Sequence, residues 1–79
     1  MASNCAAVVR RFPLHELEIR RRCARDLKFG EICEDYSEAL EALRHWEEAG
    51  PAGASRAEDF RRIRDELEVE ILEILDRPR

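Results

Sequence analysis

Hydrophobic residues recur at alternating intervals of three and four in two long segments of the chain, which is the pattern of amphipathic helices. One series lies in the middle of the chain and the other in its last third. The spacing predicts helices over residues 27–49 and 56–76, and no segment favours a β-strand. The two stripes consist of Phe29, Ile32, Tyr36, Ala39, Leu43 and Trp46, and of Phe60, Ile63, Leu67, Ile71 and Ile74.

Residues that begin and end helices stand around these stripes. Asp26 is typical of the cap before a helix. Gly50 and Pro51 are typical of a helix end, because glycine accepts a left-handed C-terminal cap and proline cannot continue the helix. Ser55 and Glu58 have the spacing of a capping box, in which each side chain accepts a hydrogen bond from the other residue's backbone amide. We therefore expect a short connector after Gly50 and a last helix capped by Ser55.

The N-terminal part of the chain carries a weaker helical signal. Pro13 suits the first turn of a helix, where its missing N–H is not needed, and residues 13–25 favour a helix. The apolar residues fall on two sides, Leu14, Leu17 and Ala24 on one and Ile19, Cys23 and Leu27 on the other. This division predicts a helix in a groove or between two neighbours. Residues 1–12 and 77–79 are expected to be flexible tails around one helical domain, residues 13–76.

Two helices of matched length with a short connector pack as an antiparallel hairpin. At about 1.5 Å per residue they would be about 34 and 31 Å long. A hairpin covers only one side of each helix, and a chain of 79 residues has a marginal core. The remaining apolar surface needs a cover, either the helix over residues 13–25 or a second copy of the chain. We expect a homodimer that forms a bundle of four or more helices.

The expected homodimer interface combines the stripes of both long helices. Tyr36 and Trp46 suit its edge, because each has an apolar ring and a polar tip. Leu72 suits it because it points away from the main stripe of its helix. The predicted interface residues are Phe29, Ile32, Tyr36, Leu40, Leu43, Trp46, Phe60, Ile63, Leu67, Ile71 and Leu72.

The distribution of charge along the chain is more informative than the net charge. The net charge is −4, which disfavours nucleic-acid binding as the main activity. Residues 1–28 carry a net charge of +4, residues 29–50 carry −6 and residues 51–79 carry −2. Either the basic and acidic segments pack side by side, or both are solvated faces. The longest uncharged apolar run is only five residues, Cys5 to Val9, so we expect no membrane span and no secretory signal.

The three cysteines, Cys5, Cys23 and Cys33, form no CxxC pair and no zinc-binding spacing. An odd number of cysteines fits a reducing compartment, and we expect a cytoplasmic protein. Cys33 and Cys23 are expected to be buried and unreactive. Cys5 lies in the predicted tail and is the one thiol expected to react.

The two long segments resemble the YdcH-like proteins, a family of small bacterial helical hairpins of unknown function. The residues that carry the resemblance are Phe29, the run ICEDYSEALEAL and the closing run DELEVEILEIL. Phe29, Tyr36, Leu67, Glu70 and Ile71 stand at positions that correspond to the family pattern, which covers about residues 14–76. The chain departs from the family in its longer second half and in Trp46. The resemblance implies a self-associating helical hairpin, and it implies no activity or catalytic residue.

A metal site is the first chemical hypothesis, because helical bundles hold metals between facing Glu and His side chains. Glu38, Glu41 and His45 share a helix face beside the apolar stripe. The predicted helix over residues 56–76 has no histidine, so only a dimer would assemble enough ligands. The ordinary interpretation is that these three side chains form a solvated surface.

Catalytic patterns are weaker still. A nucleophilic Cys33 would need a histidine base and an orienting group nearby, and the segment around Gly50 is no phosphate-binding loop. Two arginine clusters, Arg20–Arg22 with Arg25 and Arg61–Arg62 with Arg64, spread around their helices and alternate with acids. We therefore expect no enzyme and no cofactor.

The leading functional hypothesis is a homodimerising interaction module that binds a protein partner, whose basic surface would be steered by the acidic segment 31–48. Two alternatives are a metal-binding protein that uses Glu38, Glu41 and His45 across a dimer, and a weak nucleic-acid binder that uses the arginines of residues 20–25.

Overall fold

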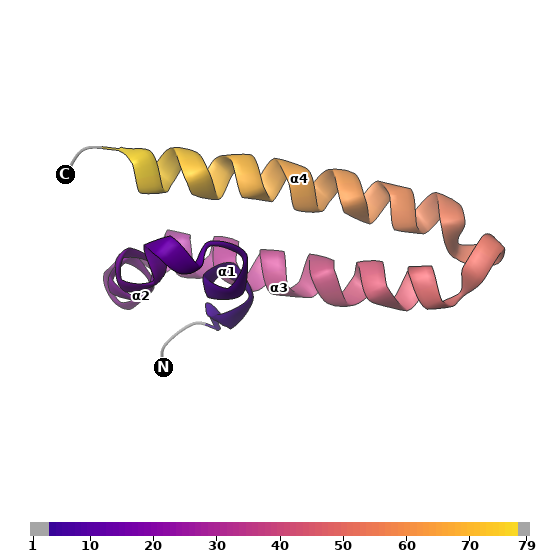
Figure 1. Cartoon of the computed structure of the whole chain (residues 1–79), viewed down its shortest axis with the longest axis horizontal. Helices are drawn as coiled ribbons and strands as arrows, with labels where there is room; N and C mark the ends of the chain where they lie inside the picture. The colour runs from indigo at the N-terminus through magenta and orange to yellow at the C-terminus, as the bar shows by residue number, and fades with distance from the viewer. Residues whose placement is uncertain (1–3, 78–79) are drawn as a thin grey trace.

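The computed structural model describes residues 4–77, which form helices joined by short turns (Figure 1). The elements are α1 (Ala6–Arg11), the 3-10 turn η1 (Pro13–His15), α2 (Glu16–Arg25), α3 (Leu27–Glu48), the 3-10 turn η2 (Gly50–Gly53) and α4 (Ala54–Asp76). The described residues contain no strand. The predicted all-α class, with a long hairpin and a shorter N-terminal helix, is confirmed.

α3 and α4 run side by side in opposite directions, while α1 and α2 gather at one end of this hairpin (Figure 1). The molecule is elongated, with extents of 44 × 25 × 20 Å. The core follows the seam between the two long helices and continues under α1 and α2. Phe29, Cys33, Tyr36 and Ile71 are almost completely buried there, which confirms the helical phase of the apolar stripes.

The ends of α3 have clear local causes. The Asp26 carboxylate accepts hydrogen bonds from the backbone N–H groups of Lys28 and Phe29, at 3.0 and 3.2 Å, which are amides that lack a partner inside the helix. At the other end Gly50 has a φ of +69°, a conformation that only glycine adopts readily. Both helix boundaries agree with the prediction.

The predicted capping box at Ser55 and Glu58 is wrong. α4 begins at Ala54, and no side chain caps its first turn. The turn η2 runs directly into α4, so Ser55 is already inside the helix and lacks the non-helical backbone of a capping residue. Gly53 sits at this junction because a Cβ atom there would overlap the carbonyl oxygen of Trp46.

The predicted N-terminal tail, residues 1–12, is wrong for its described part. Residues 6–11 form α1, which packs against α3. Val8 has 0% of its surface exposed, and Phe12 is buried beside it. These two apolar residues, four positions apart, anchor α1. The helix has only six residues, so it is too short to produce a visible periodicity in the sequence. Residues 1–3, 78 and 79 lie outside the described residues.

α2 packs against two neighbours, α1 and α3, which is one of the two arrangements predicted for it, but only one of its two apolar sides takes part. Ile19 is fully buried and Cys23 is partly buried, but Leu14 and Leu17 are 97% and 62% exposed. α2 lies at the end of the hairpin, so only one helix face meets α1 and α3. The other apolar face is left in solvent.

The basic N-terminal segment does pack beside the acidic α3, as one of the two interpretations of the charge pattern predicted. Direct ion pairs form elsewhere. Arg11 pairs with Glu68 of α4, and Arg20 and Arg22 pair with Glu16 and Glu18 inside α2. None of the helices in the described part of the chain has the length and apolar character that a bilayer crossing requires.

The packing of α1 can be tested by one substitution at two positions. Val8→Ala removes two buried methyl groups and should lower the free energy of unfolding by about 2 kcal/mol. Val69→Ala is the matched control, because Val69 is also in a helix but 57% exposed, and it should change stability by less than about 0.5 kcal/mol. Urea unfolding followed by circular dichroism measures both. Equal effects of the two substitutions would contradict the packing of α1.

Candidate interaction surface

An open apolar groove of about 360 Å³ runs between α3 and α4. Ala39 and Ala42 form its floor on α3, and Phe60, Ile63 and Leu67 line it from α4. Two carboxylates, Asp35 and Glu38, stand at its α3 edge. We call these seven residues the seam groove.

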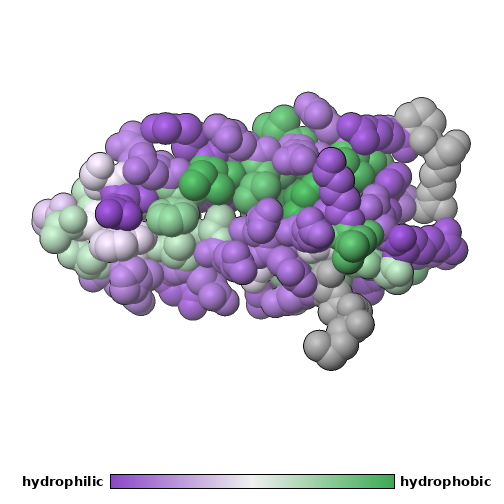
Figure 2. Space-filling view, turned by 180° about the vertical axis from the view of Figure 1, so that it is seen from behind, coloured by the Kyte–Doolittle hydropathy of each residue, from purple (hydrophilic) through white to green (hydrophobic). Residues whose placement is uncertain are grey.

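The seam groove lies on the side of the hairpin that α1 and α2 leave uncovered. Leu40 of α3 lines another depression together with Ala7 and Arg10 of α1, whereas the alanines of the seam groove belong to another side of the same helix. Seen from behind, hydrophobic residues form a band along the hairpin between rows of hydrophilic ones (Figure 2). Ile63, in the middle of the groove, is 42% exposed. An apolar band of this kind, rimmed by polar residues, is typical of an interaction surface.

The predicted interface residues fall into three groups. Those that are buried inside the chain's own hairpin are Phe29, Ile32, Tyr36, Leu43 and Ile71. Those that are half-buried are Leu40, Trp46, Phe60 and Leu67, and those that are exposed are Ile63 and Leu72. The residues of the first group are already buried within one chain without a second copy. Only the half-buried and exposed residues are therefore available to a partner.

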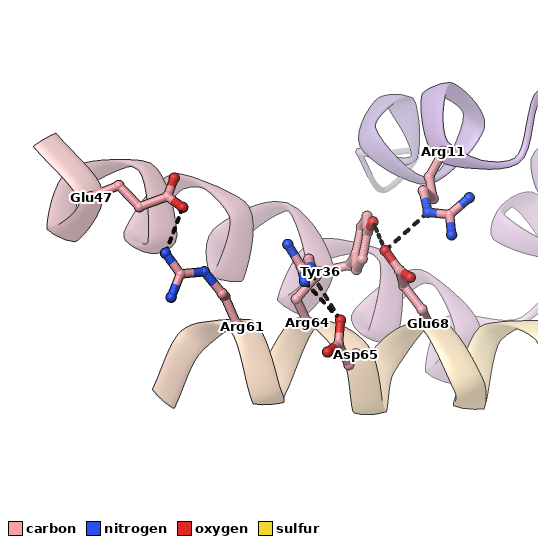
Figure 3. A network of polar contacts seen from close by, with 7 residues as sticks. All are labelled: Arg11, Tyr36, Glu47, Arg61, Arg64, Asp65 and Glu68. Carbon is pink, nitrogen blue, oxygen red and sulfur yellow. Dashed lines mark hydrogen bonds and ion pairs between the residues drawn. The ribbon is translucent and has the colours of Figure 1, made fainter. Parts of the chain in front are cut away.

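A polar network ties three helices together beside this core (Figure 3). The buried Tyr36 hydroxyl of α3 donates a 2.7 Å hydrogen bond to the Glu68 carboxylate of α4. The Arg11 guanidinium of α1 donates to the same carboxylate oxygen at 3.1 Å. Burial, together with the hydrogen bond to the carboxylate of Glu68, raises the pKa of the Tyr36 phenol. The network therefore holds Tyr36 protonated and fixes α1 against α4.

The arginine clusters are mostly neutralised. In α4, Arg61 pairs with Glu47 of α3 at 3.0 Å, and Arg64 pairs with its neighbour Asp65 at 2.9 Å; both pairs appear in Figure 3. Arg62 lies 3.9 Å from Asp59. Pairs within a helix or between neighbouring helices are ordinary surface interactions, so this cluster presents no row of free positive charge.

The metal-site candidates do not come together. Glu38 and Glu41 border a shallow depression near Asn4, but His45 instead stands edge-on to the Trp46 ring, with the ring centroids 4.9 Å apart. In the described part of the chain no three His, Cys, Asp or Glu side chains are arranged to hold a metal ion. Coordination by these residues across a dimer stays a hypothesis.

The thiols lie where α1, α2 and α3 meet. The Cys23 thiol donates a hydrogen bond to Cys33, with the sulfur atoms 3.5 Å apart. Burial raises the pKa of both thiols, the opposite of the shift that activates a nucleophilic cysteine. The prediction of an accessible Cys5 in a flexible tail is wrong, because the docking of α1 carries Cys5 inside, where its sulfur accepts a hydrogen bond from Arg20 at 4.0 Å.

The sequence analysis placed Ala39 in the apolar stripe and Asp35 and Glu38 in the acidic segment 31–48, but it did not combine them with Ala42 into one groove. Asp35, Ala39 and Ala42 follow each other at intervals of four and three, so this side of the helix was visible in the pattern. The sequence did not indicate that this side of the helix forms a groove, because the alanines are small and weakly hydrophobic. Glu68 was also missed, since nothing in the sequence links it to Tyr36, which lies 32 residues away.

Comparisons of the chain with protein-family models, with curated proteins and with solved structures return no match. The resemblance to the YdcH-like proteins therefore stays a hypothesis, and the function has to be argued from the geometry of this chain.

The polar network predicts how stability depends on pH. Tyr36→Phe should lower the free energy of unfolding by about 2 kcal/mol at neutral pH, because it removes a hydrogen bond to a charged group. A phenol whose pKa is raised by folding loses its stabilising effect as the pH rises above the unfolded value of about 10. Urea unfolding between about pH 9 and 11 should therefore show a steeper loss of stability for the wild type than for Tyr36→Phe.

Cys23 and Cys33, whose pKa values are also raised, add an alkaline loss that is common to both proteins. The difference between the two pH profiles thus reports Tyr36 alone. Parallel profiles would contradict a protonated Tyr36 held by Glu68.

Proposed function

We propose that this protein is a self-associating helical interaction module whose binding surface is the seam groove. The observation that carries the proposal is the exposure of the apolar side chain of Ile63 in the middle of the seam groove. The small side chains of Ala39 and Ala42 allow the backbone of another helix to come close. A helix that lays its apolar face into such a groove is a common mode of recognition.

The size of the chain supports this proposal. A domain of 79 residues buries a smaller fraction of its surface than a larger one, so it gains more from a partner that covers apolar groups. Each partly exposed apolar side chain that a partner covers contributes on the order of 1 kcal/mol. Phe60, Ile63 and Leu67 together supply several such contributions in one continuous surface.

The mechanism is recognition by burial, with no bond made or broken. The apolar floor of the seam groove supplies affinity, and Asp35 and Glu38 at its edge select a partner with basic side chains. We place the module in the cytoplasm, where glutathione keeps thiols such as Cys23 and Cys33 reduced.

Sedimentation of the full chain under reducing conditions tests this function. The wild type is expected to form dimers or larger species as its concentration rises. Ile63→Glu places a charge in the seam groove and should weaken self-association at least about tenfold, equivalent to about 1.4 kcal/mol. Because Ile63 is 42% exposed, the variant should keep its helical circular dichroism spectrum.

Val69→Glu is the matched control, since it replaces another β-branched residue of α4 by the same acid. Val69 lies six residues from Ile63, which is about 120° around the helix, and is itself 57% exposed. It should associate like the wild type. A wild type that stays monomeric at high concentration, or an Ile63→Glu variant that associates unchanged, would contradict the proposed function.

A further inference from the structure

α2 presents an apolar and basic face to solvent. Leu14 and Leu17 are 97% and 62% exposed, and Arg21, Ala24 and Arg25 are also exposed. Positions 14, 17, 21 and 24 follow intervals of three and four, so they share one side of the helical segment formed by η1 and α2. We call these five residues the α2 outer face.

The charges on this face form no ion pair with the part of the chain that the structure describes. Arg20 and Arg22 are neutralised inside α2 by Glu16 and Glu18. Arg21 and Arg25, by contrast, form no ion pair with any residue of the described range 4–77. The helix therefore turns two uncompensated positive charges outward, beside two exposed leucines.

The seam groove has the complementary composition. Its floor is apolar, and the carboxylates of Asp35 and Glu38 at its edge form no ion pair with the described residues. The α2 outer face matches this groove in two respects: its leucines can cover the apolar floor, and its arginines can pair with the carboxylates at the edge. Leucines three residues apart, followed by an arginine one turn later, have the spacing of anchors in a helix-in-groove contact.

We propose that the α2 outer face of one copy of this chain docks into the seam groove of another copy. Leu14 and Leu17 cover the groove around Ile63, and Arg21 and Arg25 pair with Asp35 and Glu38. This inference rests on the proposed function, because it names the occupant of the same groove.

Charge favours this arrangement over a contact between two seam grooves. A groove-to-groove dimer would place Asp35 and Glu38 of both copies in one interface whose groove lining includes no cation, and such an excess of like charge opposes binding. Docking of α2 brings opposite charges together instead. Because each copy carries one face and one groove, the contacts either close into a reciprocal pair or ring, or extend into a chain.

A mixing experiment with two full-length variants tests the arrangement. Leu17→Glu damages the α2 outer face and Ile63→Glu damages the seam groove, and both replace exposed residues, so both chains should stay folded. Native mass spectrometry is performed on each variant alone and on an equimolar mixture in which one chain is ¹⁵N-labelled. Each variant alone should be at least ten times weaker in self-association than the wild type. The mixture should form a labelled–unlabelled dimer, because one intact face still meets one intact groove.

The other outcomes separate this inference from the proposed function. If Leu17→Glu associates like the wild type while Ile63→Glu does not, the groove is used but α2 is not its occupant. If both variants are monomeric and their mixture is monomeric too, docking of α2 into the groove is also overturned. If the wild type is monomeric, or if both variants associate unchanged, the inference and the proposed function fail together.

A charge exchange tests the electrostatic part. Arg21→Glu with Arg25→Glu should weaken association of the full chain, and raising the salt concentration should weaken association of the wild type, because exposed charges are screened. Asp35→Arg with Glu38→Arg should weaken it equally. An equimolar mixture of these two double variants should recover association at least tenfold over either alone. Failure of the mixture to recover would overturn the proposed pairing of α2 with the groove edge.

Discussion

Two helices that pack side by side can bury only one stripe each, and this constraint shapes the whole molecule. The seam between α3 and α4 takes Phe29, Tyr36 and Ile71 out of water, but it leaves both flanks of the hairpin open. α1 and α2 cover one flank at one end (Figure 1). The other flank keeps the seam groove. The position of the groove therefore follows from how few elements a chain of 79 residues can supply.

The partly buried carboxylate of Glu68 shows how the short N-terminal part becomes one body with the hairpin. It accepts hydrogen bonds from Tyr36 of α3 and Arg11 of α1, so a single side chain of α4 links three helices. The two donors together offset the cost of removing most of the water around this carboxylate. The same contact that fixes α1 thus also fixes the relative position of the long helices.

Charge is divided between the interior contacts and the surface in an informative way. Five of the eight arginines of α2 and α4 form ion pairs with nearby acids, and the other three form none with the residues that the structure describes. Two of the arginines without an ion pair, Arg21 and Arg25, stand beside exposed leucines on α2. Two of the carboxylates without an ion pair, Asp35 and Glu38, stand at the edge of the seam groove, where Ile63 is exposed. Apolar exposure and unpaired charge coincide at both places, as expected for surfaces that meet.

The sequence by itself determined the long helices, because helical periodicity and helix caps depend on residues close together in the chain. It predicted the stripe from Phe29 to Trp46, the cap at Asp26 and the helix end at Gly50. The sequence did not predict α1, which is held in place by the burial of Val8. It also placed the start of α4 wrongly, because the 3-10 turn η2 runs directly into this helix. Only the tertiary structure decided which apolar residues stay exposed. Ile63 and Ile71 belong to one stripe, yet Ile63 is 42% exposed and Ile71 is fully buried, because burial depends on which neighbours α1, α2 and α3 place against each point of the helix.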